Sequence, residues 1–132
     1  MVDRHPLLDD DDGSAPVEFV LVGAVLTFLT LAVLQLGFAV YIRNVVHDAA
    51  VEGAYHAALA DTSLVDGVAR TEDVVARVVG DAYPVEVQAA ETQRFGYPAT
   101  EVRVRATLPV AGLWGVPEAL EVTAHAPNER FD

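Results

Sequence analysis

The sequence contains no cysteine and no lysine. Without cysteine it can form no disulfide, no thiolate metal site, no Cys nucleophile and no lipid-modified Cys. All eight bases are arginine, 20 acids outnumber them, and the formal charge is −12. Because there is no polybasic patch, we expect no binding to nucleic acid. Apolar residues still make up 52% of the 132 residues, so charged and apolar residues must be segregated along the chain.

The longest apolar run is Phe19–Ile42, which contains no charged residue. As a helix it would measure about 36 Å, enough to cross a hydrocarbon core of about 30 Å with some tilt. A buried helix of a soluble protein is the alternative, but such helices are shorter. A cleaved secretory signal has a shorter apolar region led by basic residues, whereas here Asp9–Asp12 precede the run. The run therefore predicts a transmembrane segment over 19–42.

The junction before this run has the sequence Gly13-Ser14-Ala15-Pro16-Val17-Glu18-Phe19. Pro16 suits a first helical turn, and Glu18 suits the positive end of the helix dipole. Those preferences account for both residues without any special function. However, a carboxylate at the edge of a membrane is costly unless it is paired. A glycine placed five residues before a lone glutamate and a long apolar helix is therefore a candidate functional motif.

The motif resembles the class III signal of type IV pilins and pseudopilins. In that family a prepilin peptidase cuts after the glycine, which implies cleavage after Gly13 and a mature protein that begins at Ser14. The new α-amine is mostly cationic near neutral pH. The resemblance implies that Glu18 of one subunit accepts the amine of a neighbour, with Phe19 at the start of the shared helix.

The strings GSAPVEFVLV, YIRN and DAAVEGA over residues 13–54 resemble the TadE-like family more narrowly. These proteins are pilin-like minor components of tight-adherence (Flp) pilus systems. The resemblance implies a single-pass protein of the cytoplasmic membrane with a cytoplasmic N-terminus and its C-terminal domain at the cell surface. Its partners would be membrane lipid, the prepilin peptidase, other pilin-like subunits and the Tad secretion apparatus. Charge does not decide the orientation, because Arg4 and Arg43 flank the run one on each side.

Several residues of the apolar run recur at helical spacings of four and three. Small residues at such positions let transmembrane helices approach closely, so this stripe is a candidate surface for packing against neighbouring subunits. Glycine and threonine are also common in membrane spans, and a chance arrangement is an equal alternative. The stripe consists of Gly23, Thr27, Thr30 and Gly37, and it continues through Leu34, Tyr41 and Asn44.

The rest of the chain predicts an α+β fold. The first helix is expected over 14–61, with Gly53 as its only weak point, and a second helix from the N-cap Thr71 to Pro84. Alternation with period two then predicts three antiparallel strands packed on the long helix. The expected strands are 85–89, 101–108 and 120–126, separated by turns at 96–98 and 112–117.

This pattern divides the chain into a cytoplasmic leader over 1–13, an N-terminal helix over 14–61 and an extracytoplasmic α+β domain over 62–132. Leu113, Trp114 and Val116 lie between glycines in the last turn. They are expected either to plug the core or to form a partner-binding tip at the far end of the domain. The leader, the long helix and the α+β domain together predict a pilin-like architecture.

No catalytic pattern is present in the sequence. The four histidines fall in no zinc motif, and nucleophile-elbow and phosphate-loop motifs are missing. The acid pairs Glu86/Glu91 and Glu101/Glu121 are expected on a solvated sheet face. We therefore expect no enzyme, no cofactor and no metal site, but a structural or assembly subunit of a pilus. The alternatives are an uncleaved signal-anchored protein with a ligand- or partner-binding C-terminal domain, and a small membrane-bound enzyme or its accessory subunit.

Overall fold

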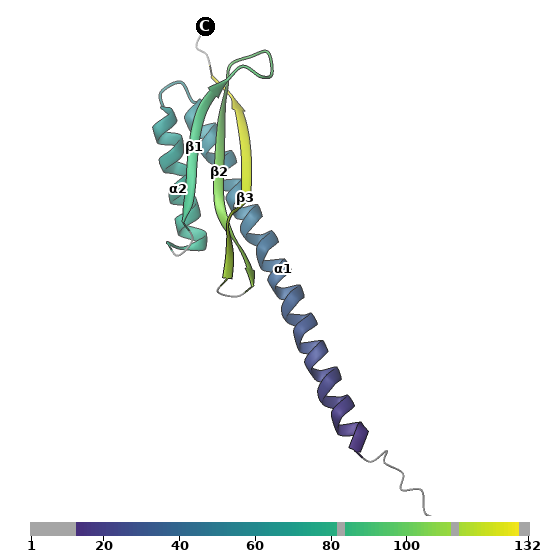
Figure 1. Cartoon of the computed structure of the whole chain (residues 1–132). Helices are drawn as coiled ribbons and strands as arrows, with labels where there is room; N and C mark the ends of the chain where they lie inside the picture. The colour runs from purple at the N-terminus through teal and green to yellow at the C-terminus, as the bar shows by residue number, and fades with distance from the viewer. Residues whose placement is uncertain (1–12, 82–83, 112–113, 130–132) are drawn as a thin grey trace, which may run out of the picture. The chain divides into compact units, whose positions relative to one another are not determined.

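The computed structural model describes residues 13–81, 84–111 and 114–129, and for 108–111 and 114–119 it describes the backbone. Two helices precede three strands: α1 (Ser14–Ala58), α2 (Leu64–Val79), β1 (Val85–Thr92), β2 (Ala99–Ala111) and β3 (Trp114–Pro127) (Figure 1). This confirms the α+β class, with a long apolar N-terminal helix, a second helix and a three-stranded antiparallel sheet. The chain divides into two compact units, one ending at Leu34 and the other beginning at Gln35.

The C-terminal part of α1 is one wall of the core in the second unit. Its buried residues recur every three or four positions, which places them on one face of the helix. Most of them are alanine, so the sheet can approach the helix closely. The buried set is Ile42, Val46, Ala49, Ala50, Gly53, Ala54, Ala57 and Ala58.

The first helix ends three residues earlier than expected, at Ala58. Its last carbonyl groups still find donors, as the free end of a helix requires. The Thr62 hydroxyl donates to the carbonyls of His56 and Leu59, and the Glu129 amide donates to the Ala58 carbonyl at 2.9 Å. The chain therefore leaves the helix in a tight, hydrogen-bonded link.

The second helix begins seven residues before the expected Thr71, so that prediction was wrong. Ser63 is the N-cap: its hydroxyl accepts from the Asp66 amide at 3.3 Å, and its amide donates to Asp66 Oδ2 at 2.9 Å. This reciprocal capping box starts the helix ahead of Asp66 and Gly67, two residue types that usually favour turns. The helix ends at Val79, before Pro84, and Gly80 follows at a φ of 84° with its amide bonded to Ala76.

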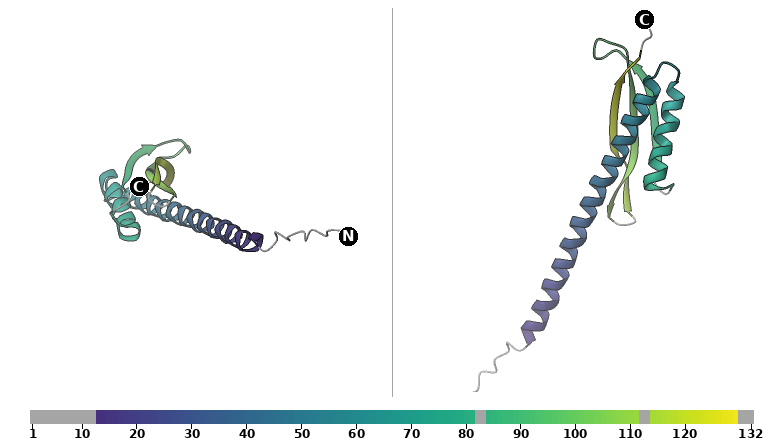
Figure 2. Two further views of the ribbon diagram at one scale, coloured as in Figure 1. Left: turned by 60° about the horizontal axis from the view of Figure 1, so that its bottom comes forward. Right: turned by 180° about the vertical axis from the view of Figure 1, so that it is seen from behind.

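The two helices cover one face of the sheet side by side (Figure 2). They meet at Gly53 and Gly67. A Cβ atom at Gly53 would lie 1.8 Å from Thr71 Oγ1, and one at Gly67 would lie 2.4 Å from the Ala57 Cβ. Thr71 is fully buried there and donates to the Gly67 carbonyl at 2.9 Å. Gly53 is thus required by the close approach of α2 and is not merely a weak point of α1.

The strands are ordered β1-β2-β3 and pair antiparallel throughout. The turn expected at 96–98 is confirmed, with Gly96 at a φ of 79° and its amide bonded to the Gln93 carbonyl at 3.0 Å. Each strand contains its predicted segment but is longer. The expected turn over 112–117 is too wide, because β2 continues to Ala111 and β3 begins at Trp114. The sheet contributes the other wall of the core: Val102, Val104, Ala106, Leu120, Val122, Ala124 and Ala126.

Candidate processing and assembly site

Gly13 lies immediately before the first residue of α1. It is exposed, and no atom lies within 4 Å of the position that a Cβ would occupy. The peptide bond between Gly13 and Ser14 therefore sits at an open helix start. The remainder of the predicted leader, including Asp9–Asp12, lies outside the described residues.

Glu18 and Phe19 follow within the first two turns of α1. Both are exposed, and the side chain of Phe19 is 80% exposed. Pro16 occupies the first turn, where its missing amide hydrogen costs no helical hydrogen bond. The helix thus presents a single carboxylate beside an aromatic ring, at the point where its long apolar surface begins.

The candidate packing stripe lies on an open surface of α1. Gly23 and Gly37 have no atom within 4 Å of a would-be Cβ. The Thr30 hydroxyl donates to the Leu26 carbonyl at 2.8 Å, so it is satisfied within its own helix and needs no partner from outside. Thr27 is exposed like the others. No described residue of this chain occupies the stripe, which leaves it accessible to another helix or to lipid.

The described part of the first unit, residues 13–34, buries none of its large apolar side chains. Among the described helices, α1 is the one long and apolar enough to cross a membrane. Between Val17 and Leu34 every large apolar residue is at least 56% exposed, and Phe28 reaches 75%. Exposing this much apolar surface to water would be strongly unfavourable. Length, composition and exposure together fit a single-pass membrane anchor.

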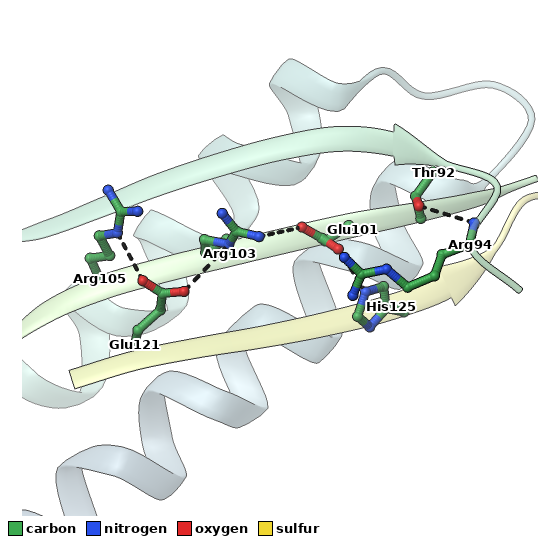
Figure 3. A network of polar contacts seen from close by, with 7 residues as sticks. All are labelled: Thr92, Arg94, Glu101, Arg103, Arg105, Glu121 and His125. Atoms are coloured by element: carbon green, nitrogen blue, oxygen red, sulfur yellow. Dashed lines mark hydrogen bonds and ion pairs between the residues drawn. The ribbon is translucent and has the colours of Figure 1, made fainter.

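The sheet face turned away from the helices carries a polar network (Figure 3). His125 Nε2 lies 2.8 Å from Glu101 Oε2, and Arg103 donates to Glu101 Oε1 at 3.0 Å. Glu121 accepts from Arg105 at 3.0 Å. The expectation of a solvated Glu101 was wrong, since its side chain is only 14% exposed. The hydrogen bond with His125, helped by the charge of Arg103, lowers the pKa of the Glu101 carboxyl.

The junction and the stripe remain predictions, whereas two arrangements within the second unit were missed by the sequence analysis. The crossing of Gly53 with Gly67 was missed because each glycine alone resembles a helix breaker. The Glu101–His125 pair joins strands that are adjacent only in the fold, and its two members stand at directly paired positions of β2 and β3. Antiparallel alignment of the two predicted strands could have suggested that pair.

Comparison with known proteins agrees with the geometry of the junction. Residues 13–54 match the family described as TadE-like protein. No curated protein and no solved structure matches the chain. The matched segment begins at the open glycine and ends within the part of α1 that packs against the sheet. The resemblance is confirmed over residues 13–54: that segment of the chain is similar to TadE-like proteins.

Proposed function

We propose that the chain is a minor pilin-like subunit of a Flp-type tight-adherence pilus, processed after Gly13 by a prepilin peptidase. Its role is structural: the apolar part of α1 packs with the helices of other subunits, and the α+β part faces outward. The proposed function requires no side chain to catalyse a reaction. The proposal divides the chain into a leader over 1–13, a helix over 14–61 with 19–42 in the membrane, and an extracytoplasmic domain over 62–132.

One coincidence carries this proposal. The family match begins at Gly13, and α1 begins one residue later with no other described part of the chain packed against the glycine. Five residues further on stands Glu18, the only charged residue of α1 before Arg43. A peptidase that cuts after Gly13 would create an amine at the start of the helix, close to the acid that a neighbouring subunit offers.

The proposed partners are inferred from the exposed apolar surface of α1 and from the glycine junction. The exposed apolar side chains of α1 require lipid before assembly and helices of other pilin-like subunits afterwards. The glycine junction requires a prepilin peptidase whose active site faces the leader, which places the N-terminus in the cytoplasm. Export and assembly would then depend on the Tad secretion apparatus.

Mass spectrometry of the protein purified from its native host tests the proposal. The expected species begins at Ser14 and lacks the four consecutive aspartates. A host without its prepilin peptidase is the control, and there the mass should correspond to the uncut chain.

An uncut chain in a host with an active peptidase would overturn the proposal. That result would favour the alternative, an uncleaved signal-anchored surface protein whose C-terminal domain binds a ligand or partner.

A further inference from the structure

The sheet-bearing unit contains the end of the apolar run. It begins at Gln35, whereas the run extends to Ile42. Gln35 and Ala39 are half-buried and Ile42 is 2% exposed, while Leu36 and Val40 on other sides of the helix are 67% and 50% exposed. Part of this unit therefore covers one side of α1 over residues 35–42, and apolar side chains on the other sides of the same segment remain exposed.

The far ends of α1 and the sheet are joined, which sets the level of each strand along the helix. The Glu129 amide, two residues after β3, donates to the Ala58 carbonyl at 2.9 Å. From Ala58 back to Ile42 the helix covers about 24 Å. From Ala99 to Ala106 strand β2 covers about 23 Å. Ala106 and Ile42 belong to the same core cluster, as this arithmetic requires.

Beyond Ala106 the hairpin of β2 and β3 continues past Ile42 toward the start of α1. Residues 107–111 and 114–117 are here termed the hairpin end. They remain paired at Leu108–Val116, Pro109–Gly115 and Ala111–Trp114, with two shifts of register between Ala106 and Ala111. Residues 107–111 add about 16 Å, enough to reach back over the whole of 35–41. Both long views show the hairpin end beside this segment of α1 (Figures 1 and 2).

The composition of the hairpin end differs from that of the opposite end of the sheet. From Ala106 to Pro117 the sequence contains no ionisable side chain, and it includes Trp114, the only tryptophan of the chain. The opposite end carries Glu91, Arg94 and Glu129, all exposed. Tryptophan is enriched where a bilayer meets water, because its ring is largely apolar and its N–H is polar.

The length of the membrane segment indicates that lipid extends along α1 to the level of the hairpin end. Residues 19–34 measure about 24 Å as a helix, less than a hydrocarbon core of about 30 Å. A bilayer that covers this helix must also include the first turns of the second unit, at Gln35–Val40. The hairpin end lies alongside those turns, and Arg43 follows them as the first charge of α1 after Glu18.

We infer that the hairpin end is a second membrane contact of the protein, inserted at the boundary between lipid headgroups and acyl chains beside α1. The inference rests on the proposed membrane anchoring and is independent of cleavage. A boundary position suits a paired strand end, whose remaining backbone groups still need water. The backbone of Trp114 and Val116 thus lies at the membrane end of the domain and not at its far end, and Leu113 lies outside the described residues.

Trp114 itself reports on this contact, since no other residue contributes tryptophan fluorescence. The full chain is placed in phosphatidylcholine and phosphatidylglycerol vesicles, with lipids brominated either near the headgroup or near the bilayer centre. We expect headgroup-side bromine to remove about half of the emission and centre-side bromine to remove much less, as for other interfacial tryptophans. Acrylamide in the water should quench Trp114 several-fold less than a water-exposed tryptophan.

Two variants in a Trp114→Phe background calibrate the measurement. Phe28→Trp replaces an exposed ring in the middle of the apolar run and should be quenched by centre-side bromine. Tyr97→Trp replaces a half-exposed ring on the β1–β2 turn and should respond to acrylamide alone. If neither lipid quenches Phe28→Trp, the membrane anchoring fails and the inference fails with it.

Three other results would overturn the inference alone, with Phe28→Trp behaving as expected. Quenching of Trp114 by acrylamide and by neither lipid would place the hairpin end in water, free for another protein. Protection from both kinds of quencher would mean that Trp114 plugs the core. Stronger quenching from the bilayer centre would place it too deep for a boundary contact.

Discussion

The proposed processing would depend on Gly13. It is exposed and has open space around it, so a larger side chain there would not disturb α1. We expect Gly13→Leu to remain in the membrane fraction but to keep its leader, because the bulky group obstructs a peptidase that requires a small residue. Immunoblots of membranes from the native host measure this as a slower-migrating band. A processed band of normal mobility would contradict the expectation.

The proposed pairing between subunits would depend on Glu18. Glu18→Gln keeps the shape and polarity of the side chain but removes the charge that would attract a neighbour's amine. We expect normal insertion and a several-fold loss of co-purification with the partner pilin-like subunits. Glu72→Gln is a matched control, since it makes the same change on an exposed residue of α2. Equal recovery of partners with both variants would exclude charge pairing at Glu18.

At the scale of the elements, the contact between α1 and α2 depends on Gly67. A Cβ at Gly67 would meet the Ala57 Cβ at 2.4 Å and the Gly53 carbonyl oxygen at 2.8 Å, and neither neighbour can rotate away. We expect Gly67→Ala to lower the free energy of unfolding by about 1–3 kcal/mol, despite the better helix propensity of alanine. Urea denaturation in detergent, followed by circular dichroism, measures the change.

Gly37→Ala is the matched control for this contact. It makes the same replacement in a helix where no atom lies within 4 Å of the new group. Its free energy of unfolding should stay the same or rise slightly, because alanine is favoured in helices. If the two variants lose stability equally, the tight packing at Gly67 carries no energetic weight.

Some of the helices and strands could be predicted from the sequence alone, and others could not. The apolar run and the alternation of Val102, Val104 and Ala106 are local patterns, so α1 and the central strand could be predicted. The start of α2 was missed because Gly67 is explained only by the approach of α1. The ends of β2 and β3 were missed because their uncharged sequences do not alternate. The junction at Gly13 and Glu18 was recognised from its spacing and its resemblance to pilins, and its proposed pairing stays a prediction because it involves a second chain.

At the scale of the whole molecule, the Glu101–His125 pair couples stability to pH. The folded protein holds the pKa of Glu101 below its usual value, mainly through the hydrogen bond with His125. The pair's contribution is therefore complete above the ordinary glutamate pKa and is lost as the pH falls through the lowered one. Glu101→Gln should lower the free energy of unfolding by about 1 kcal/mol near neutral pH.

The variant should also respond less to acid. Urea denaturation at a series of pH values between neutral and the acidic range separates the two effects. The difference between the native protein and Glu101→Gln should shrink as the pH falls, because the native carboxylate becomes protonated as well. A constant difference across the series would show that Glu101 stabilises the fold in some other way than through its charge.

The burial of Ile42–Ala58 decides how this molecule can be released from a membrane. That stretch supplies one wall of the core, so a protease nick in the link between Leu59 and Ser63 would leave both pieces bound to each other. With the apolar run in the membrane as proposed, shedding of a folded fragment would need a cut on the N-terminal side of Ile42, where soluble proteases would have no access. Because α1 and the sheet share one core, proteolysis at the cell surface would therefore not release a folded fragment.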